Sequence, residues 1–180
     1  RDMIDVRETI DLCLERHDKA YEKLYDAMYS TVYNTCMRYA ENGTIAKDYM
    51  QDCYIKIFDK LELFIGDTMA DLGAWVKRVC VNYCVDQARG WKPRFCDYVM
   101  LNNVESESNE DDFKSMFTLH QIFDAIHMLS PGYKAIFNMF VLDGYTHEEI
   151  TRELGLTPGA SKATLFKAKR KVRQILLATA

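Results

Sequence analysis

The sequence predicts an all-α protein with two helical domains joined by an acidic, flexible linker. Apolar residues recur at helical spacing over most of the chain, the alternation typical of strands is absent, and only 3 prolines and 8 glycines occur among 180 residues. The helical pattern fails between Phe95 and Ser115, where residues 102–112 are polar and carry five acids. We therefore expect one domain over 1–94, the linker over 95–115 and a second domain over 116–180.

The composition predicts a globular protein of the cytoplasm. Hydrophobic residues make up 48% of the chain and aromatic residues 12%, which is enough to bury two cores. No run of about 18 apolar residues exists, and the first residues do not form a charged-then-apolar export signal. We expect neither membrane insertion nor export.

Three helices are predicted in the first domain, over 18–40, 45–63 and 70–89, with a loop at 64–68 before the third. Each has apolar residues at intervals of three and four, which form one buried face. The buried stripe of the third helix is expected to contain Leu72, Trp75, Val76, Val79, Cys80 and Tyr83. The exposed face of the second helix is strongly charged and consists of Lys47, Asp48, Gln51, Asp52, Lys56 and Asp59.

The third helix also carries a polar face that leads into a basic and aromatic patch. Asn82, Asp86 and Arg89 are spaced by four and three, so they lie side by side. Taken alone, this face is better explained as a hydrogen-bonded helix surface with an Asp86–Arg89 pair. Basic residues around an aromatic ring are, however, the combination that grips phosphates and stacks bases. The patch consists of Arg89, Trp91, Lys92 and Arg94.

Four helices are predicted in the second domain. The first is amphipathic and spans 113–129. The second begins at Ser130-Pro131 and runs to Asp143, where Gly144 ends it. The last two helices follow directly, and the turn between them is short enough for a helix-turn-helix.

Local signals define both ends of this helix-turn-helix. Thr146 and Glu149 form a capping box at the start of its first helix, and Gly155 ends that helix as a residue able to take a positive φ. Thr157 is a good N-cap for the second helix, and Pro158 fits its first turn, where a missing N–H costs nothing.

The last helix has an apolar face and a basic face. The apolar stripe consists of Ser161, Leu165, Ala168, Val172, Ile175 and Leu176. The residues that point away are Lys162, Ala163, Phe166, Lys167 and Arg170. Seven basic residues occur against one acid between Thr151 and Ala180, in a chain of net charge −4. A charge run alone is typical of a solvated face, but caps, turn and stripe in this order favour DNA contact.

No cysteine or histidine pattern predicts a metal site or an active site. The six cysteines lack a Cys-x-x-Cys pair and are best explained as small buried hydrophobes. Cys80 and Cys84 are four apart on one predicted helix, but no second pair has a matching spacing. The four histidines are isolated on helices. We therefore expect no metal, no cofactor and no catalytic residue.

Nearly the whole chain resembles the extracytoplasmic-function (ECF) sigma factors, the compact two-domain initiation subunits of bacterial RNA polymerase. In the first domain the resemblance lies in AYEKLYDAMYSTVYNTCMRY, AKDYMQDCYIKIFDKLELFIG and AWVKRVCVNYCVDQAR. In the second it lies in LSPGYKAIFNMFVLDGYTHEEITRELGLTPGASKATLFKAKRKVR. The resemblance is specific because both domain patterns occur in the right order, separated by an acidic linker.

The resemblance implies a sigma factor that binds bacterial core RNA polymerase, recognises promoter DNA and helps to open it. The first domain would bind polymerase through Asp48, Gln51 and Asp52. It would handle the minus-ten promoter element through Phe64, Asn82, Asp86, Arg89, Lys92 and Arg94. The second domain would read the minus-thirty-five element as duplex through Lys162, Ala163, Thr164, Phe166, Lys167, Arg170 and Lys171. Such a protein is not an enzyme and is monomeric when free, and the resemblance leaves open whether an anti-sigma factor binds it.

Two other hypotheses remain open at this point. An autonomous helix-turn-helix regulator, with a helical sensing or dimerising N-terminal domain, would bind a palindromic operator as a dimer without polymerase. A gel shift with the purified protein alone separates this regulator from a sigma factor. A helical enzyme or metal protein would use the cysteines and histidines, although no spacing supports it. Metal analysis of the purified protein tests that second hypothesis.

Overall fold

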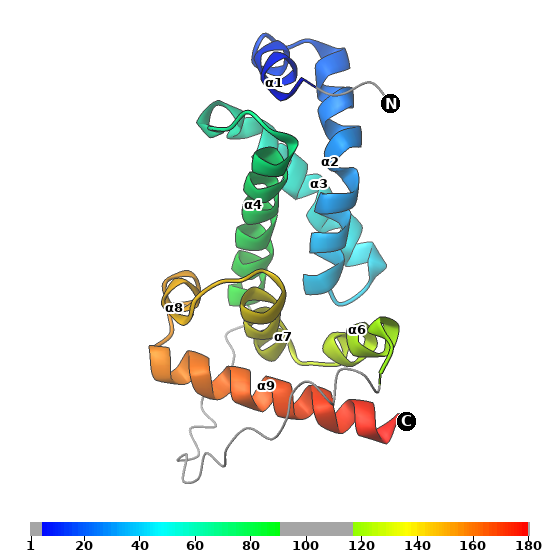
Figure 1. The fold of residues 1–180 in the computed structure, drawn as a ribbon, viewed down its shortest axis with the longest axis vertical. Helices are drawn as coiled ribbons and strands as arrows, with labels where there is room; N and C mark the ends of the chain where they lie inside the picture. Colours follow the sequence, from blue (N-terminus) through cyan, green and yellow to red (C-terminus); the bar gives the residue numbers. More distant parts are fainter. Residues whose placement is uncertain (1–4, 91–116, 180) are drawn as a thin grey trace. The chain divides into compact units, whose positions relative to one another are not determined.

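The computed structural model describes residues 5–90 and 117–179, apart from the side chains of 88–90. The regular structure in these ranges is helical, and the chain divides into two compact units, Arg1–Asp86 and Gln87–Ala180 (Figure 1). The predicted all-α class with two helical domains is confirmed. The predicted linker and both of its boundaries lie outside the described residues.

From residue 5 on, where its description begins, the first unit consists of four α-helices and a short 3₁₀ turn. In Figure 1, α2, α3 and α4 lie side by side, and α1 packs across the first turns of α2. Their large, fully buried side chains include Leu24 and Val32 from α2, Ile57 from α3, and Leu72 and Val76 from α4. The elements are α1 (Val6–Leu14), α2 (Asp18–Tyr39), α3 (Gly43–Asp59), the 3₁₀ turn (Leu61–Leu63) and α4 (Met69–Gly90).

Helix α1 was not predicted, although its signals are present in the sequence. Asp5 caps it, accepting a hydrogen bond from the Glu8 N–H at 2.9 Å. Val6, Ile10 and Cys13, spaced by four and three, are its buried apolar residues. The helix has only nine residues, so its apolar pattern repeats too few times to stand out in the sequence.

Helix α3 begins earlier and ends earlier than predicted. The Asn42 side chain accepts hydrogen bonds from the N–H groups of Thr44 and Ile45, both at 3.0 Å, so the helix begins at Gly43. The α-helix ends at Asp59, and the chain tightens into the 3₁₀ turn. The expectation of one continuous helix to residue 63 was therefore wrong in its last turn, and Leu61 is nevertheless buried.

In the described residues 117–179 of the second unit, four α-helices are arranged so that α9 packs against each of the other three (Figure 1). Ile136, Ile150 and Leu176, from three different helices, are among its fully buried side chains. The elements are α6 (Leu119–His127), α7 (Pro131–Phe137), a π segment (Asn138–Leu142), α8 (His147–Leu154) and α9 (Pro158–Ala178). The predicted four-helix domain is confirmed.

Two helices of this unit differ from their predicted extents. Helix α6 begins at Leu119, where Thr118 and Gln121 form a capping box, while residues 113–116 lie outside the described residues. The helix expected to run to Asp143 changes to π geometry after Phe137, and the Asp143 N–H donates to the Asn138 carbonyl at 2.9 Å.

The local signals of the helix-turn-helix are confirmed. Thr146 and Glu149 form the capping box of α8, and Gly155 closes that helix in the left-handed region at φ 66°. The Thr157 side chain accepts a hydrogen bond from the Ala160 N–H at 3.2 Å, and Pro158 occupies the first turn of α9. The left-handed conformation of Gly155 and the Thr157 cap therefore fix the turn between α8 and α9.

We expect Gly155→Ala and Gly159→Ala to change stability in opposite directions. Gly155 has φ 66°, where a Cβ costs about 1–2 kcal/mol. Gly159 is helical with open space around it, so alanine should favour α9 by about 0.5 kcal/mol. Amide hydrogen exchange of α8 and α9 in the full chain measures both effects. Equal effects of the two changes would contradict the role of Gly155 as the turn residue.

Candidate nucleic-acid interface

The outward face of α9 combines basic side chains with one exposed aromatic ring. Lys162, Phe166 and Arg170 are exposed, at successive spacings of four, so they form one line along the helix. Ala163 and Lys167 are half-buried beside this line. The opposite stripe is buried as predicted, with Ser161, Leu165, Ala168, Val172 and Leu176 packed inward and Ile175 half-buried.

Two α9 residues that were predicted to contact DNA, Thr164 and Lys171, lie off the line formed by Lys162, Phe166 and Arg170. Thr164 is only 8% exposed, because it follows Ser161 by three residues and precedes Ala168 by four, which places it on the buried stripe. Lys171 is exposed, but its Nζ lies 4.6 Å from the centroid of the Tyr133 ring in α7. We leave Thr164 out of the reading face, and Lys171 belongs to its edge.

A polar contact between the two helices of the helix-turn-helix was not anticipated. His147 Nδ1 and Ser161 Oγ share a hydrogen bond of 2.9 Å between α8 and α9. The other side of the imidazole stacks on Phe140, with ring centroids 4.6 Å apart. Burial, followed by the charge of Lys162, lowers the pKa of His147 below its ordinary value of 6.5. The neutral ring therefore fixes where α9 begins relative to α8.

A hollow of about 220 Å³ lies between α3 and α4, and we call it the α3–α4 hollow. Its wall combines three basic side chains, two aromatic rings, an amide and a carboxylate. Lys56 Nζ lies 5.7 Å from the Tyr83 ring centroid, so one of the cations faces one of the rings. The lining residues are Lys56, Lys60, Leu63, Trp75, Arg78, Val79, Asn82, Tyr83 and Asp86.

The α3–α4 hollow brings together part of the predicted minus-ten set. Asn82 and Asp86 both line it, and among the described residues the Asn82 Oδ1 is buried without a hydrogen-bond partner. The side chain of Arg89, and the whole of Lys92 and Arg94, lie outside the described residues. Sequence reasoning missed the contributions of Lys56, Lys60, Trp75 and Arg78, because they come from two helices.

The loop before α4 turns the side chain of Phe64 inward. Phe64, predicted as a minus-ten contact, is 5% exposed and packs edge-on against Trp75, with ring centroids 5.6 Å apart. A Cβ on Gly66 would lie 2.7 Å from the Phe64 ring, so only glycine allows this packing. The exposed apolar side chains are its neighbours, Ile65 at 89% and Leu63 at 63%.

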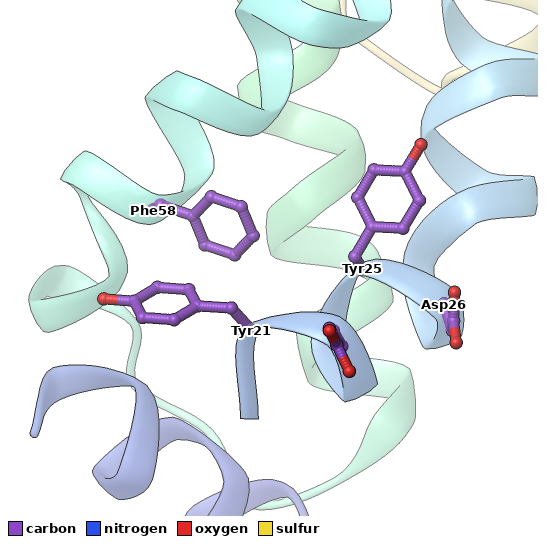
Figure 2. A pocket seen from close by; sticks show the side chains of 5 residues that line it. Tyr21, Tyr25, Asp26 and Phe58 are labelled. Atoms are coloured by element: carbon purple, nitrogen blue, oxygen red, sulfur yellow. The ribbon is translucent and has the colours of Figure 1, made fainter. Parts of the chain in front are cut away.

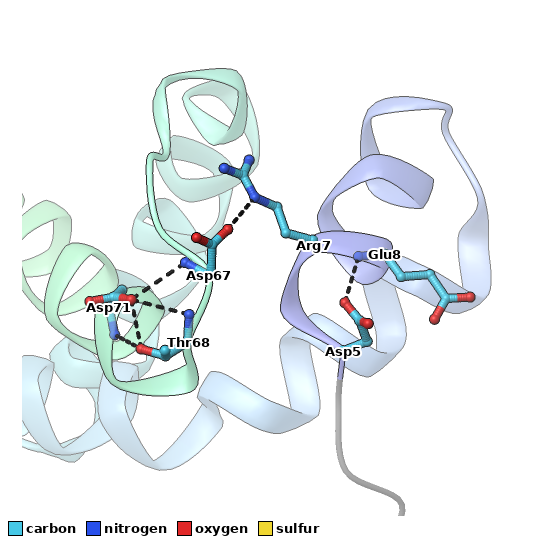
Figure 3. Close-up of polar contacts among 6 residues, drawn as sticks. All are labelled: Asp5, Arg7, Glu8, Asp67, Thr68 and Asp71. Atoms are coloured by element: carbon cyan, nitrogen blue, oxygen red, sulfur yellow. Dashed lines mark hydrogen bonds and ion pairs between the residues drawn. The ribbon is translucent and has the colours of Figure 1, made fainter.

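The same loop is held at two further points (Figure 3). The Asp71 carboxylate accepts hydrogen bonds from the Thr68 hydroxyl at 2.6 Å and from the Thr68 N–H at 3.1 Å, which caps α4. These bonds lower the pKa of Asp71. Arg7 of α1 donates to Asp67 at 2.6 Å, and this pair joins the loop to the first helix. The loop is therefore positioned from both sides.

The predicted polymerase-binding residues lie on one exposed face of α3. Asp48, Gln51 and Asp52 are all exposed and are spaced by three and one. Asp52 also accepts a hydrogen bond from the Tyr83 hydroxyl of α4. Burial, together with this hydrogen bond, raises the pKa of the Tyr83 phenol. The Tyr83–Asp52 hydrogen bond therefore connects the exposed face of α3 that carries Asp48, Gln51 and Asp52 to the α3–α4 hollow, which Tyr83 lines.

A second, more open hollow of about 430 Å³ lies between α2 and α3 (Figure 2). The rings of Tyr21 and Phe58 meet there edge to face, with centroids 5.0 Å apart. Tyr25 also lines it, together with the carboxylates of Glu22 and Asp26. Two acids among five lining residues make this hollow unsuitable for the phosphates of DNA.

Two family models match the chain, one in each half. The model described as Sigma-70 region 2 covers residues 24–92, and the model described as Sigma-70, region 4 covers residues 119–172. The ECF RNA polymerase sigma factor SigL of Mycobacterium tuberculosis strain H37Rv is 26% identical over 143 residues, which are 78% of this chain and 79% of SigL. The chain belongs to the ECF sigma factors. The helix-turn-helix lies in its region 4, and the α3–α4 hollow lies in its region 2.

Other sigma factors have similar sequences or folds. The ECF RNA polymerase sigma-E factor of Escherichia coli K12 is 27% identical over 146 residues, which are 75% of each chain. The structure of the sigma factor RpoE of Bartonella quintana, solved with the anti-sigma factor NepR, has a TM-score of 0.52 at 19% identity. It covers 86% of this chain and 94% of that one, and it shows that the fold is shared.

The family defines what the protein does. As a sigma factor it binds core RNA polymerase, recognises promoter DNA and acts in transcription initiation, and sigma factors are initiation factors rather than catalysts. The hypothesis of an autonomous regulator is not favoured, because regions 2 and 4 both match, in order. Within 5–90 and 117–179, no helix has the length and apolar character of a membrane span.

The stability of region 4 should fall as the pH falls through about 6.5, and His147 should contribute to that loss. Its pKa is lowered in the folded protein, so below its ordinary pKa the unfolded chain binds the proton more readily than the folded chain. We expect His147→Gln to flatten the pH dependence of α8–α9 hydrogen exchange between about pH 7.5 and 5.5. The exposed His120→Gln serves as the control. An unchanged pH profile in His147→Gln would contradict this role.

Proposed function

We propose that the two halves of this sigma factor read two separate promoter elements while α3 holds the polymerase. The observation that carries the proposal is the α3–α4 hollow, where cations, aromatic rings and a buried amide oxygen converge on one exposed site. Such a combination suits unpaired nucleotides better than duplex, because duplex bases cannot present their faces.

In this proposal the α3–α4 hollow holds one base of the minus-ten element after it leaves the duplex. Trp75 and Tyr83 supply ring surfaces, and the Asn82 Oδ1 supplies an acceptor that is satisfied when a base N–H reaches it. The volume of about 220 Å³ is smaller than that of most sites for drug-sized ligands, as expected for a single ring system. Sequence selectivity then comes from the base that satisfies Asn82.

The basic side chains around the α3–α4 hollow would hold the backbone of the same strand. Lys56, Lys60 and Arg78 surround the amide and the rings, so phosphates on either side of the captured base meet positive charge. The exposed Leu63 and Ile65 stand at the adjacent loop and are available to pack against neighbouring unstacked bases. The phosphate contacts position the strand, and Asn82 reads it.

In region 4, the outward line of α9 would read the minus-thirty-five element as duplex. Lys162 and Arg170 supply phosphate or guanine contacts, and Phe166, at 41% exposure, has a ring available to a thymine methyl group. Ala163 and Lys167 flank this line. The helix has its N-terminus fixed by the Thr157 cap and the His147–Ser161 contact, which sets its angle in the groove.

The proposed polymerase contact is the exposed face of α3 that carries Asp48 and Gln51, with Asp52 at its edge. The protein itself makes and breaks no covalent bond in this proposal, because the polymerase synthesises the RNA. Its work is to bind in the cytoplasm, position the promoter and stabilise the opened strand.

We expect Asp48→Arg to weaken binding to core polymerase at least about tenfold while the fold persists. The side chain is exposed, so the change should alter stability by no more than about 0.5 kcal/mol, and a reversed charge at an interface costs binding. Asp11→Arg, an exposed acid on α1, is the charge-matched control. Wild-type binding of Asp48→Arg in a pull-down at moderate salt would remove this face from the interface.

Asn82→Ala should impair promoter opening more than polymerase recruitment. The amide acts only when a base is free, and one hydrogen bond of about 1 kcal/mol corresponds to roughly fivefold in the opening equilibrium. Permanganate reactivity of promoter thymines measures opening, and a gel shift of the polymerase complex measures recruitment. Asn34→Ala, an exposed asparagine on α2, is the control. Normal opening with unchanged base preference in Asn82→Ala would exclude the proposed pocket.

A further inference from the structure

Four cysteine side chains meet in the core of region 2, where α2, α3 and α4 pack together. Cys36 comes from α2, Cys53 from α3, and Cys80 and Cys84 from successive turns of α4. All four are at most 1% exposed. The sequence offered only the Cys80–Cys84 pair, and the fold supplies the second pair from two other helices.

Three of the four sulfur atoms of this thiol cluster are close enough to share one ion. The Sγ atoms of Cys36, Cys53 and Cys84 all lie within 4.8 Å of one another. Cys36 Sγ and Cys53 Sγ are 3.8 Å apart. Cys80 lies one turn before Cys84 on α4, and its buried thiol interacts with those of Cys36 and Cys53, although its Sγ is not one of the three that lie within 4.8 Å of one another.

The Cys36–Cys53 separation agrees with the ligand spacing of a mononuclear tetrahedral site. A Zn–S bond of about 2.3 Å in tetrahedral geometry places the sulfur atoms about 3.8 Å apart, which is the Cys36–Cys53 separation. An iron–sulfur cluster places several metal and sulfide atoms between its cysteines, and the thiol cluster is too compact for that. A disulfide would use two sulfurs about 2.05 Å apart and leave the other two without a role.

We propose that Cys36, Cys53 and Cys84 bind a structural zinc ion in region 2, with Cys80, one turn before Cys84 on α4, as the fourth ligand. Four protein ligands close the coordination sphere, so the ion has no open position for a substrate or water. Binding converts thiols to thiolates and releases protons, and the binding free energy adds to the stability of the folded unit. The site joins the helix with the acidic face, α3, to the helix that carries Asn82.

The experiment uses the full chain, purified under reducing conditions and loaded with Zn²⁺ or Co²⁺. We expect about one tightly bound Zn²⁺ per chain by elemental analysis. The Co²⁺ form should show the thiolate charge-transfer and visible d–d bands of a tetrahedral sulfur site. Removing the metal with a chelator should lower the thermal midpoint of region 2 by about 5 °C or more. These measurements require no variant.

Matched cysteine variants locate the metal. Cys53→Ala and Cys84→Ala, singly, should reduce bound Zn²⁺ to less than about one tenth per chain and abolish the tetrahedral Co²⁺ bands. Cys13→Ala is the control, because Cys13, on α1 of the same unit, is equally buried but is not part of the thiol cluster. A wild-type chain with a normal helical spectrum that takes up neither Zn²⁺ nor Co²⁺ overturns the proposal. Full metal content in both cluster variants overturns it as well.

Discussion

The packing of α4 onto α2 and α3 is the contact on which the rest of region 2 depends. Leu72, Val76 and Cys80 face inward from α4 and are almost completely buried. Because a helix that buries one face must present the opposite one, this stripe also determines which residues of α4 face the α3–α4 hollow. Asn82 and Arg78 lie there as a consequence of where the core lies.

In region 4, too, the buried face of one helix determines which residues point outward, and the outward face of α9 is basic. The buried stripe of α9 fixes Lys162, Phe166 and Arg170 on the outside, while the His147–Ser161 contact fixes the turn before them. Residues 116–180 contain 8 basic and 5 acidic residues, whereas residues 1–115 contain 15 and 22. Attraction to duplex DNA is therefore concentrated on one helix, and an acidic first half disfavours non-specific binding of the whole chain.

The sequence predicted those features that are coded within about one helical turn. The capping box at Thr146, the positive φ of Gly155 and the stripe of α9 were all found from spacing alone. Features that join distant segments were missed: the Phe64 ring turns inward because Gly66 and Trp75 make room for it. The α3–α4 hollow and the thiol cluster likewise combine residues of separate helices. Helix periodicity gives the face of a residue, but not the partner opposite it.

The most direct test of two-element reading is photocrosslinking in the complex with core polymerase and promoter. A photoreactive phenylalanine analogue would replace Phe166 in one chain and Ile65 in another. The account predicts that position 166 crosslinks to duplex at the minus-thirty-five element with or without promoter opening, and that position 65 crosslinks to the minus-ten element only after opening. Crosslinks from both positions to a single element, or from position 65 to closed duplex alone, would contradict it.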